Sequence, residues 1–204
     1  MCERATGCVR CVSSAEPAIR TPSARHDPRV DMYGPSPDDA LDDHRLQVRA
    51  AMGHLSSQAV VSHVSAAVLH GLPIWRLPLD RVQVTRPGRC RGGRRSGLVH
   101  VRTNTLAPAE IVVIDGLPVT SLERTVLDIG RAHPFMQAVV VADAAARQMD
   151  VSRAWELLGE MRRWPGGPAA RRVLEFADAR SGSVGESRSR VLMAGAGLPT
   201  PELQ

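Results

Sequence analysis

The sequence predicts an α+β fold: a small mixed β-sheet with a basic hairpin, followed by a helical region and preceded by a disordered N-terminal tail. Three observations favour it. Apolar residues alternate over 81–85 and 98–102, as they do in half-buried strands. Helical spacing and helix caps dominate after residue 120. The first 43 of the 204 residues are poor in large apolar side chains, so they bury too little surface to offset the entropy of ordering.

The charge of the chain comes from arginine, because the sequence contains no lysine. Its 26 basic residues exceed its 21 acidic residues and give a net charge of +5 at pH 7. A positive field attracts phosphate and favours a nucleic-acid partner. GC-rich codons also replace lysine with arginine, so codon bias is an alternative explanation of equal weight.

No membrane or export segment is evident in the sequence. The longest apolar run, residues 138–146, is interrupted by Asp143 and falls short of the roughly 20 residues that span a bilayer. No apolar stretch follows the N-terminal charges, as it would in a secretory signal. We therefore expect a cytoplasmic protein with no membrane partner.

Four cysteines, at positions 2, 8, 11 and 90, suggest no metal centre. Cys8 and Cys11 form one CxxC pair, but structural zinc needs four ligands, usually from two such pairs. We expect reduced thiols, no metal and no cofactor. Arg29–Tyr33 predicts one short strand in the tail, and Met32 is an alternative start of the chain.

The region before residue 116 predicts two helices and three strands. The helices are Asp43–Met52, capped by Asp43 and stopped by Gly53, and Ser62–His70, capped by Ser62. Strands at 81–85 and 98–102 are expected to pair as a hairpin around the glycine-rich loop 86–95. The apolar run 111–115 predicts a third strand.

The rest of the chain predicts helices with recognisable starts. Thr120 and Glu123 form a capping box, as do Ser183 and Glu186. Asp150 is expected to cap a helix, and Pro134 suits a first turn. The expected helices end near Gly130, Gln148, Met161, Ala177 and Gly195.

The loop 86–95 is the strongest binding candidate. One guanidinium group can bind two phosphate oxygens at once, and glycines let the backbone approach a phosphate. No aromatic residues alternate with the charges, so base stacking of the single-strand kind is not supported. An acidic protein surface is an alternative partner, and a solvated turn without a partner is a third. The candidate residues are Arg86, Arg89, Arg91, Arg94, Arg95 and Arg102.

Other polar residues suggest no catalytic site. His63 and His70 lie two helical turns, about 10 Å, apart, too far to share a metal. His70 is expected to stabilise the end of its helix by charge. Asp115, Asp128 and Asp143 are interpreted as turn or surface residues, because no nucleophile and histidine accompany them at a defined spacing.

The segment from about Arg29 to the C-terminus resembles the AbiEi-type antitoxins of actinobacterial type IV toxin–antitoxin systems. The strings that carry the resemblance are Val61–Leu72, Val82–Pro87, Val99–Arg102, Val113–Asp128, Gly185–Val191 and Ala196–Gln204. Members of the family look like a winged helix-turn-helix, a middle region and, in many cases, a nuclease-like domain of the PD-(D/E)XK or very-short-patch-repair type. The resemblance implies a non-enzymatic regulator that represses its own operon or neutralises a nucleotidyltransferase toxin, with duplex DNA and that toxin as partners.

The resemblance divides the chain into four parts. Residues 1–43 are a disordered tail with the remnant of a wing strand, and residues 44–132 are the antitoxin-like α/β region. Residues 133–180 are helical, and residues 181–204 match the first helix of a truncated nuclease-like domain. We expect this last helix to have little to pack against.

Two alternatives stay open: a truncated or decaying nuclease-like protein without activity, and a remnant without function. In the resembled nucleases a first-helix acid, matched here by Glu186, helps to place a metal. Those enzymes also need an E-x-K motif. The chain has no lysine, so catalysis is not expected, and Glu186 is expected to complete a capping box.

Overall fold

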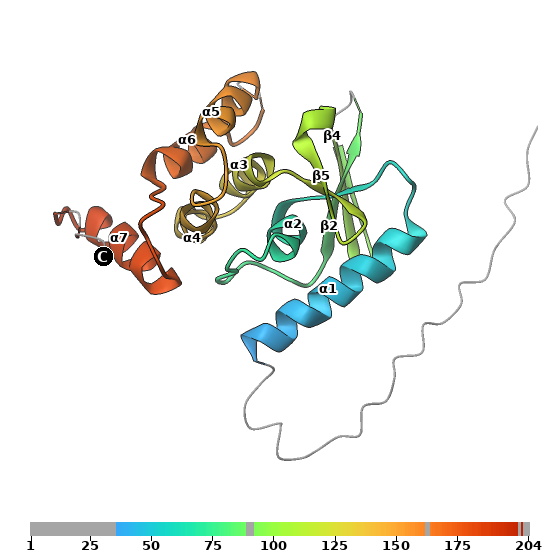
Figure 1. The fold of residues 1–204 in the computed structure, drawn as a ribbon, viewed down its shortest axis with the longest axis horizontal. Helices are drawn as coiled ribbons and strands as arrows, with labels where there is room; N and C mark the ends of the chain where they lie inside the picture. The colour runs from blue at the N-terminus through green and yellow to red at the C-terminus, as the bar shows by residue number, and fades with distance from the viewer. Residues whose placement is uncertain (1–35, 89–91, 162–163, 200, 202–204) are drawn as a thin grey trace, which may run out of the picture. The chain divides into compact units, whose positions relative to one another are not determined.

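The described residues form a six-stranded mixed sheet and seven α-helices, which confirms the α+β class (Figure 1). The computed structural model describes residues 36–88, 92–161, 164–199 and 201, all within the unit Pro35–Gln204. The predicted tail strand, residues 1–35 of the predicted disordered tail and all four cysteines lie outside the described residues. The rest of that prediction is wrong, because residues 37–43 belong to a helix that begins at Pro37.

The strand order of the sheet is β3-β4-β2-β1-β6-β5. β3 and β5 are therefore its two edges, and β1 and β2 lie near its centre. The strands are β1 (Val60–Val61), β2 (Val82–Pro87), β3 (Gly92–Ser96), β4 (Val99–Asn104), β5 (Ile111–Ile114) and β6 (Leu117–Thr120).

The sheet contains a basic hairpin, but its strands are not the two that the sequence predicted. β3 pairs antiparallel with β4 across the turn at Gly97, whose φ of +51° favours glycine. β2 and β4, the expected hairpin partners, run parallel, with Val84 opposite Val101. The reason is that part of the predicted loop is itself a strand. Because β3 adds one reversal of direction, β4 returns parallel to β2.

A second hairpin, β5–β6, is held by a two-residue turn. Asp115 and Gly116 have φ of +49° and +78°, as a type I′ turn requires. The prediction that Asp115 is a turn residue is confirmed, and its carboxylate also accepts a hydrogen bond from Arg49 at 2.8 Å. β6 was not predicted, because Pro118 and the polar Thr120 hide its pattern.

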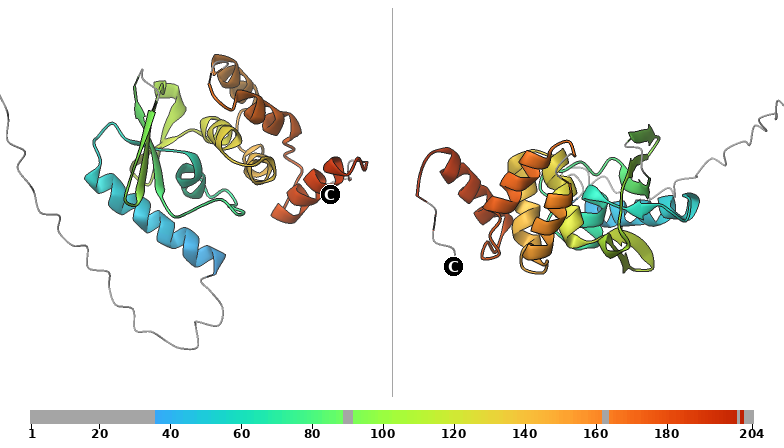
Figure 2. Two further views of the ribbon diagram at one scale, coloured as in Figure 1. Left: turned by 180° about the vertical axis from the view of Figure 1, so that it is seen from behind. Right: turned by 90° about the horizontal axis from the view of Figure 1, so that it is seen from above.

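α1 (Pro37–His54) packs with α2 (His63–Leu69) on the sheet (Figures 1 and 2). α1 begins six residues before the predicted start. Its N-cap is Ser36, not Asp43, because Ser36 and Asp39 form a reciprocal capping box of 3.1 and 3.2 Å. Apolar side chains from α1, α2 and the strands form one core, which includes Val48, Val61, Ala66, Val82, Val84 and Val119.

The helical region forms a second core around α3. α3 contacts α2, α4, α5 and α6, and the residues of its middle turns are buried. At Gly130 an added Cβ would lie 3.1 Å from the Cα of Ala170, so this glycine allows α3 and α6 to approach closely. The helices are α3 (Leu122–Ala132), α4 (Phe135–Ala145), α5 (Val151–Glu160), α6 (Gly167–Phe176) and α7 (Val184–Gly195).

In the helical region, the predicted caps of α5 and α7 are confirmed and the predicted start of α3 is displaced. Asp150 caps α5 through the backbone N–H of Arg153 at 3.1 Å. Ser183 caps α7 through the backbone N–H of Glu186 at 3.2 Å. The predicted box at Thr120 is wrong by one residue, since the N-cap of α3 is Ser121. Thr120 ends β6 instead.

α7 is not left without packing partners, contrary to the sequence-based expectation. It lies against α4 (Figure 2), with Ser187 and Arg190 buried. The sequence analysis looked for an apolar stripe on this helix and missed its packing, because α7 contacts the other helices mainly through buried polar side chains. Leu192 accordingly stays 59% exposed.

Candidate nucleic-acid interface

Four of the six predicted arginines lie on three neighbouring strands at one edge of the sheet. Arg86 is on β2, Arg94 and Arg95 are on the edge strand β3, and Arg102 is on β4 between them. Together these four residues are called the basic edge. Arg89 and Arg91, the other two candidates, lie outside the described residues.

The strand register brings the members of the basic edge together. Arg102 is opposite Gly93 on β3 and opposite Thr85 on β2. Arg95 pairs with His100 on β4. Residues directly opposite each other in a sheet lie within about 5.5 Å at Cα. The four residues are therefore spread over three neighbouring strands, where the sequence showed only one loop. Arg86 is opposite Thr103, one register position from Arg102, so Arg86 and Arg102 lie on opposite faces of the sheet.

Arg86 and Arg102 are half-buried and not freely solvated. The Nε of Arg86 is buried and has no hydrogen-bond partner among the described residues. Arg102 lies near two histidines, His63 and His133. Burial is the main reason that the pKa of each is lowered, and the positive charge of Arg102 lowers both further.

His63 is the most unusual residue beside the basic edge. It starts α2 with a φ of +55°, a conformation that costs a non-glycine residue roughly 1–2 kcal/mol. Its Nδ1 lies 3.0 Å from the Ser62 hydroxyl and 4.0 Å from the Asp128 carboxylate. Burial lowers its pKa from 6.5 to about 3, although Asp128 opposes the change. The imidazole is therefore neutral near pH 7.

A buried charge network on α3 supports this region. Arg124 is fully buried and donates to Asp128 at 2.9 Å, to Glu110 at 3.1 Å and to the Thr105 carbonyl at 3.0 Å. Asp128 also accepts from Arg131 at 3.0 Å. The prediction that Asp128 is a turn or surface residue is therefore wrong. The i, i+4 spacing of Arg124 and Asp128 was the available signal.

Trp164 closes the network from the loop before α6. Its ring lies 4.7 Å from the guanidinium carbon of Arg124 and 4.9 Å from that of Arg131. Arg131 also donates to the Pro165 carbonyl at 2.8 Å. Two cations on one indole attach this loop to α3.

The arrangement of Ser62, His63 and Asp128 does not match a catalytic triad. A triad places the acid on one imidazole nitrogen and the nucleophile on the other. Here Ser62 and Asp128 both approach Nδ1. A histidine with a pKa of about 3 is also a weak general base near neutral pH. These contacts fit a structural role, in which they fix the start of α2 against α3.

His70 and Asp143, two other residues considered in the sequence, make hydrogen bonds that hold helices in place. His70 caps the end of α2, and its Nε2 lies 2.7 Å from the Thr120 carbonyl. Burial lowers the pKa of His70, which disfavours the positive charge that was expected to stabilise the end of α2. His70 instead holds the helix end through its hydrogen bond to Thr120. Asp143, also interpreted as a surface residue, is buried and accepts from Arg190 at 2.8 Å.

Glu186 contributes to the start of α7. Its carboxylate accepts from the Gly182 N–H at 2.8 Å and from the Ser183 hydroxyl at 3.3 Å. The described residues contain no group of three or more His, Cys, Asp or Glu side chains placed to hold a metal ion. None of the described helices is both long and apolar enough to cross a bilayer.

Comparison with known proteins gives two relatives from Mycobacterium tuberculosis. They are uncharacterized protein Rv2248 of strain ATCC 25618 / H37Rv and uncharacterized protein MT2308 of strain CDC 1551 / Oshkosh. Each is 35% identical over 109 residues, which cover 52% of this chain and 39% of the relative. The chain therefore spans less than half the length of these curated relatives. No family model matches it.

Proposed function

We propose that this chain is a non-enzymatic regulator similar to AbiEi-type antitoxins, and that it binds duplex DNA through the basic edge. The observation that carries the proposal is the placement of Arg86, Arg94, Arg95 and Arg102 on three adjacent strands at the β3 edge of the sheet. Arginine forks onto phosphate oxygens, so such an array suits a sugar–phosphate backbone.

The support beneath the basic edge strengthens the proposal. Arg102 lies beside His63, which is fixed between Ser62 and the charge network on α3. A binding residue on a strand above a rigid, buried layer loses less entropy when it binds than one on a free loop.

The ligand class is a duplex and the setting is the cytoplasm. The sequences of β2, β3 and β4 contain no Phe, Tyr or Trp on which single-stranded bases could stack. Backbone contacts position a protein on DNA without reading its sequence. In this proposal the basic edge contributes affinity to operon repression, and the cognate nucleotidyltransferase toxin is the second partner.

The test is a titration of a fluorescently labelled duplex with the full chain. Fluorescence anisotropy measures binding at each of several salt concentrations. If all four arginines of the basic edge contact phosphate, the logarithm of the association constant should fall against the logarithm of salt with a slope of about −3.6. Binding that is absent at low salt, or that does not change with salt, would contradict the proposal.

A further inference from the structure

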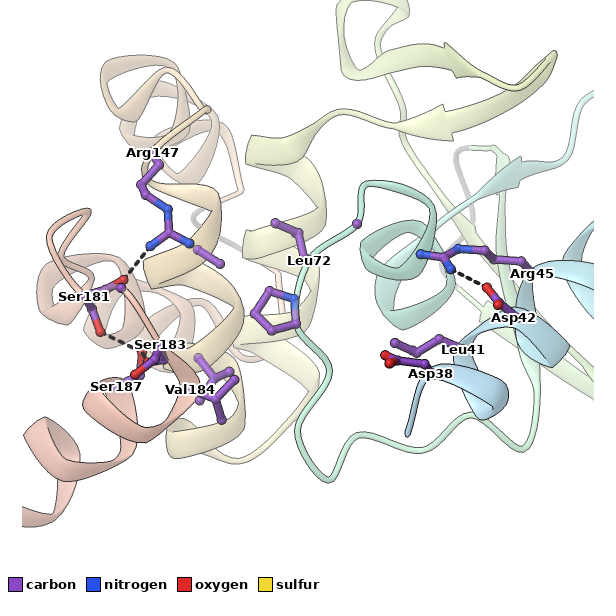
Figure 3. Close-up of a pocket in the computed structure, with 15 residues that line it drawn as sticks. Asp38, Leu41, Asp42, Arg45, Leu72, Arg147, Ser181, Ser183, Val184 and Ser187 are labelled. Carbon is purple, nitrogen blue, oxygen red and sulfur yellow. Dashed lines mark hydrogen bonds and ion pairs between the residues drawn. The ribbon is translucent and has the colours of Figure 1, made fainter. Parts of the chain in front are cut away.

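A second candidate site is a cavity of about 650 Å³ between α1, the loop after α2, α4 and the start of α7 (Figure 3). It is separate from the basic edge, since no member of that edge lines it. Its size falls within the roughly 300–1,000 Å³ of small-molecule sites. The cavity is therefore large enough to take a ligand.

Opposite charges stand on two walls of this cavity. Asp38 lies on α1, and Arg147 extends from the end of α4 (Figure 3). Asp38 forms no ion pair with any described residue. By contrast, the neighbouring Asp42 is paired with Arg45 at 2.6 Å. Arg147 donates one N–H to the Ser181 carbonyl, which holds its guanidinium at the wall. The remaining guanidinium N–H groups are further donors.

The surface between the two charges is mixed, with apolar side chains beside the serines of the segment before α7 and of α7 itself. Leu72, only 4% exposed, lies between the walls in Figure 3. Leu41, Val140 and Val184 add further apolar lining from α1, α4 and α7. A ligand that reaches from Asp38 to Arg147 would thus meet both apolar side chains and serines.

Buried polar contacts hold the α4–α7 wall together. The hydroxyls of Ser181 and Ser187, both at least 98% buried, lie 3.0 Å apart. Arg190 and Asp143 join α7 to α4 through a second buried contact. A wall that is already ordered reduces the entropy cost of binding.

We propose that this cavity binds a short zwitterionic peptide with free ends. The terminal ammonium pairs with Asp38, the terminal carboxylate pairs with Arg147, and the side chains lie over Leu72. Both pairs are charge-assisted hydrogen bonds. The class follows from the carboxylate of Asp38 on one wall, the guanidinium of Arg147 on the other and a mixed surface between them.

The experiment is isothermal titration calorimetry of the full chain at low salt with the tripeptide Ala-Leu-Ala, its N-acetylated form and its C-amidated form. Each blocked form removes one terminal charge. We expect each to bind the wild-type chain up to about fivefold more weakly than the free peptide, as for one partly exposed charge pair.

Four variants assign each end of the peptide. Asp38→Asn should abolish the effect of N-acetylation, and Arg147→Gln should abolish the effect of C-amidation. Asp43→Asn on α1 and Arg188→Gln on α7 remove the same charges from positions that do not line the cavity. Both controls should keep the wild-type pattern.

Three results would overturn the proposal: no heat of binding at millimolar free peptide, equal affinity for free and blocked peptides, or the same change in the control variants. None of them bears on DNA binding, because the cavity and the basic edge share no residue.

Discussion

Arg190 on α7 donates to the carboxylate of Asp143 on α4 at 2.8 Å, and the side chains are 6% and 1% exposed. The same carboxylate accepts from the backbone N–H of Asp178 at 2.9 Å, and Arg190 also donates to the Phe176 carbonyl. One buried pair thus joins α7, α4 and the segment between α6 and α7.

Asp143→Ala should destabilise the fold by about 3–5 kcal/mol, because it leaves the Arg190 guanidinium buried without its carboxylate. Urea unfolding measures the loss, and amide hydrogen exchange should rise across α7. The exposed Ser189→Ala on the same helix should stay within about 0.5 kcal/mol of wild type. The Asp143→Ala/Arg190→Ala double variant should cost clearly less than the sum of the two single variants. Additive costs would show that the two residues are not coupled.

Stability should fall as the pH falls below 6.5. His63 has a folded-state pKa of about 3, lowered mainly by burial, so only the unfolded chain takes up its proton between pH 6.5 and 3. Because the unfolded state then binds more protons, the free energy of unfolding should drop by up to about 1.4 kcal/mol per pH unit from this group. Burial lowers the pKa of His44, His70 and His133 too, which adds to the slope in the same direction.

His63→Asn isolates the contribution of that residue. Asparagine tolerates a positive φ better than most residues, so the backbone of α2 is kept. Urea unfolding between pH 7 and 4 should give a shallower dependence on pH than in wild type, whereas His54→Asn, which removes an exposed histidine, should not. A His63→Asn slope equal to that of wild type would show that His63 does not stay neutral in the folded chain.

Gly166 and Gly159 should respond to alanine with opposite signs. Gly166 caps α6 with a φ of +79°, and an added Cβ would lie 2.4 Å from the Arg131 carbonyl oxygen. Gly166→Ala should therefore cost at least about 2 kcal/mol. Gly159 lies in α5 with nothing within 4 Å of an added Cβ, so Gly159→Ala should stabilise by up to about 1 kcal/mol. Thermal melts measure both, and a rise in Tm for Gly166→Ala would contradict the geometry.

The sequence predicted the helical half of the fold well because helix signals are local. The side chains of Asp150 and Ser183 cap their helices within three residues, so no distant partner is needed. The sheet was harder. β1 is two residues long, and the pairing of β2 with β4 depends on a strand, β3, whose basic and glycine-rich sequence resembles a loop.

The charged residues show where local pattern fails. Asp128 and Asp143 look like any exposed acid in a helix, yet each is 1% exposed. Their burial depends on Arg124, four residues away, and on Arg190, 47 residues away. A sequence pattern can reveal a partner four residues away on the same helix, but it cannot reveal one that is 47 residues away. The basic edge was predicted in part. The sequence identified its arginines, but it did not show that they are spread over three strands.

The central claim is that the basic edge binds duplex DNA. The most direct test compares the salt dependence of duplex binding by the wild-type chain, Arg94→Gln/Arg95→Gln and Arg171→Gln/Arg172→Gln. The last pair is a matched control, because it removes two adjacent exposed arginines from α6. We predict that the log–log slope of Arg94→Gln/Arg95→Gln becomes less steep by about 1.8, or 0.9 for each lost phosphate contact. The control should keep the wild-type slope. An unchanged slope for Arg94→Gln/Arg95→Gln, or an equal change in both variants, would contradict the account.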